Sequence, residues 1–448
     1  MLPAALVAAG LGGAATAETL RPAPGEALQA VVERAHDGDT IEFPAGEHRG
    51  TLRIDRRLML AGLPGARLDG GGAGSVITVL VPDVTIRDLT ITGSGRDLAA
   101  MDSAIFLTRT AHRALVENNH IENNLFGVYV HGAAGSRLTG NVVIGLRAVR
   151  RNETGNGVTV WNAPDVIISG NTFRYGRDGI FSIATRKDRF IGNRFEQVRY
   201  AFHYMYTNDS EVSGNVSANN LGAYAIMFSD RITIRDNISD RDQEFGLLLN
   251  SANYSSIVGN RVVGGRLGAA AAAREEAPRE ERGMLPRTAA VAPGRQHGPE
   301  KCVFIYSANL NRFGENWFER CDIGIHFTAG SERNEITGNA FIGNRNQVKY
   351  VGTRFLDWSK DGRGNYWSDN PAFDLDGDGI ADTAYRPNDL FDRVLWTAPA
   401  AKVLIASPAV QVLRWAQAQF PALYPGGVID RHPLMAPPPR PPAAGNPQ

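Results

Sequence analysis

Residues 190–215 read FIGNRFEQVRYAFHYMYTNDSEVSGN. The pair Gly-Asn occurs twice in this stretch, and the two asparagines, Asn193 and Asn215, are 22 residues apart. The same pattern of alternating apolar residues recurs on both sides of this stretch. Each copy ends in an asparagine, at Asn119, Asn141, Asn171, Asn193, Asn215, Asn237, Asn260, Asn316 and Asn339. The successive spacings are 22, 30, 22, 22, 22, 23, 56 and 23. A fixed period in the twenties is typical of a solenoid.

Each repeat carries the alternating pattern of a strand and lacks the 3.6-residue period of a helix. At about 3.3 Å per residue, a 22-residue unit has room for three short strands and their turns, which is one full coil. Parallel strands joined in this way are almost always connected with a right-handed sense. The sequence therefore predicts an all-β fold, a right-handed parallel β-helix.

The composition narrows the functional classes. The 448 residues include 47 basic and 47 acidic side chains, so no net charge favours binding to nucleic acid or to an anionic membrane. Residues 1–17 are apolar and end in Ala15-Thr16-Ala17, a pattern typical of a secretory signal peptide. We therefore expect a mature protein that works in an exported compartment.

The remaining chain divides into three expected parts. Residues 18–370 form the β-helix, beginning with an amphipathic capping helix over 24–36. A low-complexity insertion at 267–300 interrupts it, because a spacing of 56 exceeds one 22-residue period by 34; we expect this insertion to be disordered. Residues 371–434 hold an acidic loop and C-terminal helices, and 435–448 form a Pro/Ala-rich tail that we also expect to be disordered.

Two cysteines occur, Cys302 and Cys321. They fall in neighbouring repeats but out of register, because one period beyond Cys302 lies Gly324. A disulfide is open to them, but the register favours two small buried thiols. A metal site made from these two residues alone would lack ligands.

Alternation along one strand of each repeat separates inward from outward residues. Inward pairs such as Val128/Val130 and Phe202/Tyr204 are apolar. The outward neighbours are apolar as well, which is unusual for a surface; they are Tyr129, His131, Thr159, Trp161, Phe181, Ile183, His203, Met205, Ala225, Met227, Leu248, Phe304, Tyr306 and His326. We interpret this stripe as a partner interface or as a surface covered by the chain's own tail.

Three outward residues suggest copper. Met205 and Met227 are one period apart, so they should stack about 4.8 Å from each other, and His203 points the same way as Met205. One imidazole and two thioethers suit transiently bound Cu(I). Methionine is also common at protein interfaces without a metal.

Residues 374–382 read DLDGDGIAD. Asp374, Asp376, Asp378, Ile380 (through its carbonyl) and Asp382 occupy positions 1, 3, 5, 7 and 9 of a calcium loop. Position 12 is Tyr385, where an EF-hand has a glutamate. The loop indicates a structural calcium site that is not a complete EF-hand, and an ion-free turn is the alternative.

A C-terminal helix is expected to begin at Ser407-Pro408, with a capping serine and proline at the first helical position. Its apolar face includes Val412 and Trp415. Such a helix can cap the solenoid or dock on another protein.

Three stretches resemble the NosD family, the periplasmic maturation proteins of nitrous oxide reductase. They are CDIGIHFTAGSERNEITGNAF (321–341), GNYWSDNPAFDLDGDGIADTAYRPNDLFDR (364–393) and SPAVQVLRWAQAQFPALYPGGVIDRHPLM (407–435). The resemblance implies a non-enzymatic role in assembling the copper–sulfide centre of that reductase. It also implies three partners: an ABC transporter of permease and ATPase, a copper chaperone lipoprotein, and the reductase itself. The insertion 267–300 is foreign to the family pattern.

The alternative is a carbohydrate-binding or polysaccharide-modifying β-helix protein. Trp161 and Tyr129 could stack on sugar rings. Acid–base cleavage of a glycoside needs a pair of carboxylates, and the central outward positions carry no Asp or Glu. Asp178 lies nearby on a turn, where we expect a solvated charge.

Overall fold

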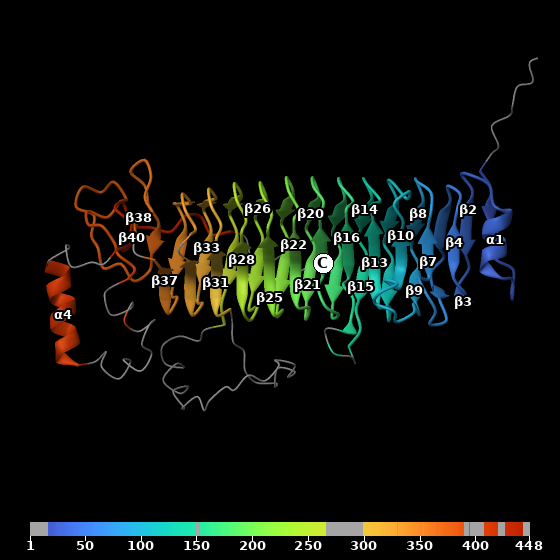
Figure 1. Cartoon of the computed structure of the whole chain (residues 1–448), viewed down its shortest axis with the longest axis horizontal. Helices are drawn as coiled ribbons and strands as arrows, with labels where there is room; N and C mark the ends of the chain where they lie inside the picture. The colour runs from blue at the N-terminus through green and yellow to red at the C-terminus, as the bar shows by residue number, and fades with distance from the viewer. Residues whose placement is uncertain are drawn as a thin grey trace, which may run out of the picture.

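The computed structural model describes residues 17–147, 150, 153–265, 299–328, 330–352, 354–388, 394, 407–419 and 426–441. Figure 1 shows one elongated solenoid, with the N-terminal coils at one end and the acidic-loop region at the other. Three parallel sheets of 13, 12 and 13 strands run along its length. The predicted right-handed parallel β-helix is confirmed.

Each complete coil contributes one strand to each sheet, and single additional strands lie at the two ends. Sheet A contains β1 (Thr19–Leu20), β2 (Thr40–Phe43), β5 (Met59–Gly62), β8 (Thr85–Arg87), β11 (Leu115–Glu117), β14 (Arg137–Thr139), β17 (Ile167–Ser169), β20 (Arg189–Ile191), β23 (Glu211–Ser213), β26 (Thr233–Arg235), β29 (Ser256–Val258), β32 (Arg312–Gly314) and β35 (Glu335–Ile336). Sheet B contains β3 (Gly46–Arg49), β6 (Ala66–Asp69), β9 (Thr90–Thr92), β12 (His120–Glu122), β15 (Val142–Ile144), β18 (Thr172–Arg174), β21 (Arg194–Glu196), β24 (Val216–Ala218), β27 (Ile238–Asp240), β30 (Arg261–Val263), β33 (Trp317–Glu319), β36 (Ala340–Ile342) and β39 (Tyr366–Trp367). Sheet C contains β4 (Leu52–Ile54), β7 (Ile77–Val79), β10 (Ser103–Leu107), β13 (Phe126–His131), β16 (Val158–Trp161), β19 (Ile180–Ile183), β22 (Tyr200–Met205), β25 (Gly222–Met227), β28 (Phe245–Asn250), β31 (Lys301–Tyr306), β34 (Ile323–Thr328) and β37 (Asn346–Val351).

The core is a continuous column of inward side chains. Residues predicted to point inward, such as Val128, Phe202 and Leu249, are fully or almost fully buried. Aromatic rings stack from coil to coil: the ring centroids of Phe173 and Phe195 are 5.0 Å apart, with planes 5° from parallel. Stacking equal side chains buries every apolar position against its own copy in the next coil, which is why a repeat sequence is stable only as an array.

The repeat asparagines form a buried amide ladder. Asn193 donates from its backbone N and from Nδ2 to Oδ1 of Asn215, at 2.8 and 3.1 Å, and the pattern recurs from Asn119 to Asn365. The residue before each ladder asparagine from Asn119 to Asn339 has a left-handed backbone, as at Gly214 (φ 62°). That conformation explains the Gly-Asn pair, because glycine adopts it without steric cost.

Both ends of the solenoid are closed by non-repeating segments. Helix α1 (Leu28–Arg34) buries Leu28, Val31 and Val32 against the first coils, confirming the expected capping helix in a shorter form. At the other end Asp430 accepts hydrogen bonds from the backbone N of Asn365 and from Nε1 of Trp367. This carboxylate terminates the ladder. The adjacent pair β38 (Phe355–Asp357) and β40 (Gly427–Ile429) completes this end.

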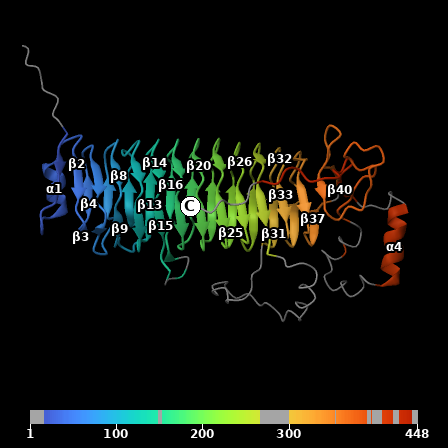
Figure 2. The same cartoon turned by 180° about the vertical axis from the view of Figure 1, so that it is seen from behind.

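The C-terminal tail departs from expectation. Residues 435–441, which we expected to be disordered, run back along sheet B (Figure 2). Arg440 donates to both carboxylate oxygens of the buried Glu319, at 2.9 and 3.0 Å, and its guanidinium lies over the Trp317 ring. The sequence alone did not reveal this distant partner. The described tail therefore covers sheet B and leaves the stripe on sheet C untouched.

The cysteines also depart from expectation. Cys302 and Cys321 form a disulfide, with Cα atoms 5.6 Å apart, and both are fully buried. The prediction of two thiols was wrong because it compared positions one period apart. The bond instead joins the start of β31 to the turn after β33, almost one full coil later along the chain.

Other expected segments fall partly outside the described residues. These are the signal peptide (1–16 of 1–17), most of the insertion (267–298) and the end of the tail (442–448). Helix α4 (Pro408–Gln419) forms where the Ser407-Pro408 signal placed it. It stands at the C-terminal end of the solenoid, away from the coils (Figure 1). Among the described residues, no helix is long and apolar enough to cross a membrane.

Candidate functional site on the outer face of sheet C

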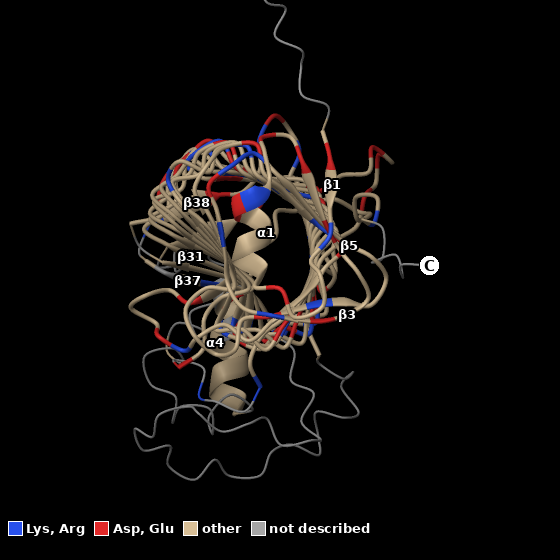
Figure 3. Ribbon diagram, turned by 90° about the vertical axis from the view of Figure 1, so that its right-hand side faces the viewer, with Lys and Arg blue, Asp and Glu red and all other residues tan. Residues whose placement is uncertain are grey.

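The outer face of sheet C carries two columns of side chains in register. The first column runs Phe106, Tyr129, Thr159, Phe181, His203, Ala225, Leu248, Phe304 and His326. The second runs His131, Trp161, Ile183, Met205, Met227, Asn250 and Tyr306. We call these two columns the stripe. Seen along the solenoid axis, charged residues gather at the turns, and the strands around β31 and β37 are mostly uncharged (Figure 3).

The stripe is only partly open to solvent. Tyr129 packs with Leu125 and Phe126, and Leu248 packs with Ala225 and Phe245. Trp161 and Tyr306 stay 37% and 49% exposed. The stripe is therefore a well-packed apolar surface with a few exposed aromatic side chains. As a whole it is less exposed than the sequence suggested.

The three proposed copper ligands lie in one part of the stripe. His203 and Met205 are alternate residues of β22, and Met227 is the direct register partner of Met205 on β25. Next to His203 in the first column is Ala225, a small and fully buried residue. The structure thus brings the imidazole and both thioethers to one face, on neighbouring strands.

Asp178 is the residue that our sequence reasoning misread. Its side chain is 1% exposed, and it forms a two-pronged ion pair with Arg199: Nε to Oδ1 at 2.7 Å and Nη2 to Oδ2 at 2.5 Å. Nδ1 of His203 lies 3.2 Å from Oδ2 of Asp178. Burial alone would raise the pKa of Asp178, but hydrogen bonds from His203 and Arg199 outweigh it and lower that pKa. The expected solvated charge is a buried anchor instead.

The register contained a signal for this contact. Asp178 lies one 22-residue period before Tyr200, so its side chain had to meet the start of β22. The turn between sheets B and C brings Arg199 to the same place, and the Arg199 guanidinium lies over the Tyr200 ring. A charged residue at a turn is solvated only when no neighbouring coil covers it, and here the next coil does.

His326 lies at the far end of the first column. It stacks on Phe304 with ring centroids 4.8 Å apart, and its Nδ1 is buried without a hydrogen-bond partner. Burial, with Lys349 and Lys301 close by, lowers the pKa of His326 to about 4. This imidazole is therefore neutral at physiological pH.

The acidic loop gathers three of its five expected ligands. Carboxylate oxygens of Asp374, Asp376 and Asp378 lie within 4.8 Å of one another. Asp374 also accepts from the backbone N of Gly377 and Gly379. Oδ2 of Asp382 instead accepts from the backbone N of Leu375.

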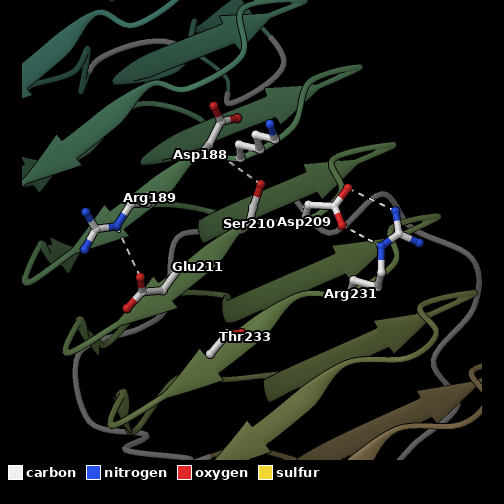
Figure 4. Close-up of a pocket in the computed structure, with 8 residues that line it drawn as sticks. Asp188, Arg189, Asp209, Ser210, Glu211, Arg231 and Thr233 are labelled. Carbon is white, nitrogen blue, oxygen red and sulfur yellow. Dashed lines mark hydrogen bonds and ion pairs between the residues drawn. The ribbon is translucent and has the colours of Figure 1, made fainter.

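A pocket elsewhere on the solenoid is lined by charged side chains of sheet A and its turns (Figure 4). Arg189 pairs with Glu211, and Arg231 pairs with Asp209. Because four of its six charged side chains are paired with one another, the pocket offers little to an ionic ligand. The stripe is the better candidate site.

The fold and the outer face of sheet C together define a β-helix protein that presents imidazole and thioether groups on one of its sheets. More specifically, the chain belongs to the NosD family. The family model described as "Periplasmic copper-binding protein (NosD)" matches residues 140–372, and a right-handed β-helix model matches residues 67–173. The family is thus described as periplasmic and copper-binding.

Two relatives are similar over most of the chain. The chain is 40% identical over 393 residues to the "Probable ABC transporter binding protein NosD" of Stutzerimonas stutzeri, covering 88% of this chain and 86% of that protein. It is also 40% identical over 426 residues to the protein of the same name from Pseudomonas aeruginosa, covering 94% and 95%. Among solved structures, the surface adhesin PfbA of Streptococcus pneumoniae has a TM-score of 0.52 at 10% identity over 72% of this chain and 87% of that one. That likeness concerns the fold alone.

Proposed function

We propose that this protein binds Cu(I) as cargo on the outer face of sheet C and passes it on during assembly of the copper–sulfide centre of nitrous oxide reductase. The observation that carries the proposal is the alignment of His203, Met205 and Met227 on adjacent outward positions. Neutral nitrogen and sulfur donors suit Cu(I). The copper-binding description of the family supports the same cargo.

A Cu(I) titration against a competing chelator, without oxygen, tests the proposal. We expect tight binding by the parent protein and loss of that binding in His203→Ala/Met205→Ala/Met227→Ala. The matched control is His120→Ala/Met59→Ala/Met435→Ala, which removes the same groups away from the stripe. Equal affinity of the parent and the stripe variant would overturn the proposal.

Partner docking forms the second part of the proposal. The names of both relatives refer to an ABC transporter, and we propose that this chain works with a transporter permease and ATPase and with a copper chaperone lipoprotein. The exposed residues of the stripe and of α4, where Trp415 is 65% exposed, are the docking surfaces. We expect Val412→Glu/Trp415→Glu to reduce co-purification with the transporter while leaving Cu(I) affinity unchanged. Unchanged co-purification would exclude α4.

We also propose that the acidic loop holds a structural calcium ion. Three clustered carboxylates repel one another unless a cation neutralises them. Calcium should therefore raise the melting temperature of the parent protein and leave Asp374→Asn/Asp376→Asn/Asp378→Asn unaffected. If calcium and a chelator both leave the parent unchanged, the loop holds no calcium.

A further inference from the structure

We infer that Asp178 and Arg199 are positioning residues, which hold the His203 ring so that it presents Nε2 to the cargo ion. The inference rests on the proposed function, since it concerns the same ligand set. It assigns a role to two residues that do not themselves touch the ion.

The contacts around Nδ1 of His203 set the orientation of the ring. Nδ1 lies 3.2 Å from Oδ2 of Asp178 and 3.2 Å from Nη2 of Arg199. The guanidinium can only donate and the carboxylate can only accept, so Nδ1 bonds to one of them and not to both. Because Nη2 of Arg199 already donates to Oδ2 of Asp178, we assign the bond of Nδ1 to the carboxylate. A proton on Nδ1, donated to Asp178, leaves the lone pair of Nε2 free. Metal-bound histidines are held by a carboxylate in the same way.

The surrounding rings restrict rotation of the imidazole. The Phe181 ring lies 4.9 Å from it at an angle of 50°, and the Tyr200 ring lies 5.5 Å away almost at a right angle. The His203 side chain is only 12% exposed. With Nδ1 engaged and the ring packed on two sides, Nε2 is the nitrogen left for a ligand.

The burial of the ion pair argues against a merely structural role. Taking a carboxylate and a guanidinium out of water costs several kcal/mol per ion, and an apolar pair is often equally stable. Most ion pairs on the described part of the solenoid, such as Asp83 with Arg113, are exposed at the surface; a second buried pair, Arg261 with Glu319, lies on sheet B, away from the stripe. The pair that contacts His203 has the more deeply buried carboxylate.

The test uses Asp178→Ala/Arg199→Ala, because removing both partners avoids leaving one charge buried alone. The matched control is Asp83→Ala/Arg113→Ala, which removes an exposed pair with the same two-pronged geometry. Asp178→Asn, which keeps an acceptor oxygen for Nδ1 and leaves only the partly exposed Arg199 without its charge partner, is the conservative variant expected to retain function.

The first readout needs no metal. Nitrogen NMR of the His203 ring reports which ring nitrogen carries the proton. We expect the Nδ1–H form in the parent, in the control and in Asp178→Asn, and a mixture of both forms in Asp178→Ala/Arg199→Ala. The same mixture in the parent would overturn the inference.

The second readout is Cu(I) binding. We expect Asp178→Ala/Arg199→Ala to bind Cu(I) about 10- to 100-fold more weakly, with sulfur but less nitrogen in the X-ray absorption spectrum. Adding His203→Ala to that variant should cause little further loss. If Asp178→Ala/Arg199→Ala keeps the Cu(I) affinity and the nitrogen signal of the parent, the inference about positioning is wrong, while the proposed copper site still stands. Failure of the proposed function would give a different result: His203→Ala/Met205→Ala/Met227→Ala would then bind Cu(I) as tightly as the parent.

Discussion

Asn215 joins three coils through one amide. Its Nδ2 donates to the carbonyl of Phe190 and to Oδ1 of Asn237, and its Oδ1 accepts from Asn193. The side chain is fully buried, so water cannot replace any of these bonds. Buried polar groups that lose their partners cost about 1–3 kcal/mol each.

We therefore expect Asn215→Ala to lower the free energy of unfolding by about 2–4 kcal/mol. Asn250→Ala is the control, since Asn250 lies on the outer face of β28 and its side chain is partly exposed; its effect should stay below about 1 kcal/mol. Urea unfolding measures the free energy of unfolding of both variants. Equal losses would show that the ladder hydrogen bonds of Asn215 contribute no more to stability than a partly exposed asparagine does.

Asp188 makes stability depend on pH. Its burial raises its pKa from 3.8 to about 8. The folded protein keeps this proton where the unfolded chain has lost it, so the free energy of unfolding falls between about pH 4 and pH 8. Asp188→Asn removes this dependence. We expect the variant to match the parent near pH 4 and to gain at most about 1.4 kcal/mol per pH unit above that. A gain that shrinks as pH rises would contradict the assignment.

Strand β31 is linked to a later part of the chain by a disulfide bond. The disulfide joins its second residue, Cys302, to Cys321 just before β34, closing a loop of one coil. This loop follows the insertion 267–300, so the bond fixes the coil at which the solenoid resumes. A loop of this length stabilises a protein by about 3 kcal/mol, mainly by restricting the unfolded chain.

Replacing both cysteines with alanine should therefore lower the free energy of unfolding by about 3 kcal/mol. Hydrogen exchange should rise most in β31, β33 and β34, and the coils around Asn141 should change least. A reducing agent added to the unfolded parent should give the same loss on refolding. No difference between the reduced and oxidised forms would indicate that the bond is dispensable.

The solenoid must be closed at both ends, because an open coil exposes its core and its unpaired strand edges. Helix α1 closes the first end by burying apolar side chains. Asp430 closes the second end through polar contacts, in a segment that returns from beyond α4.

Asp430→Ala should leave the backbone N of Asn365 and Nε1 of Trp367 without partners. We expect a loss of about 2–4 kcal/mol and faster hydrogen exchange that begins at β39 and β36. The N-terminal coils provide the internal control. Exchange that rises uniformly along the solenoid would contradict a local capping role.

The sequence predicted most of the fold, and for a simple reason. A period of 22 or 23 residues, interrupted by two longer spacings, sets which residue stacks on which, so the register, the inward core and the outward stripe with His203, Met205 and Met227 could all be assigned before the structure. Helix α1 and the start of α4 followed from local signals, an apolar face and a capping serine with proline.

Tertiary structure decided the contacts that do not repeat. The disulfide, the return of Arg440 to Glu319, and the burial of Asp178 against Arg199 and His203 each join residues at separations that the period does not specify. A repeat fixes neighbours one coil apart. The partners of turns, tails and caps depend on where the folded chain brings them, and for His203 that placement set Asp178 and Arg199 beside Nδ1.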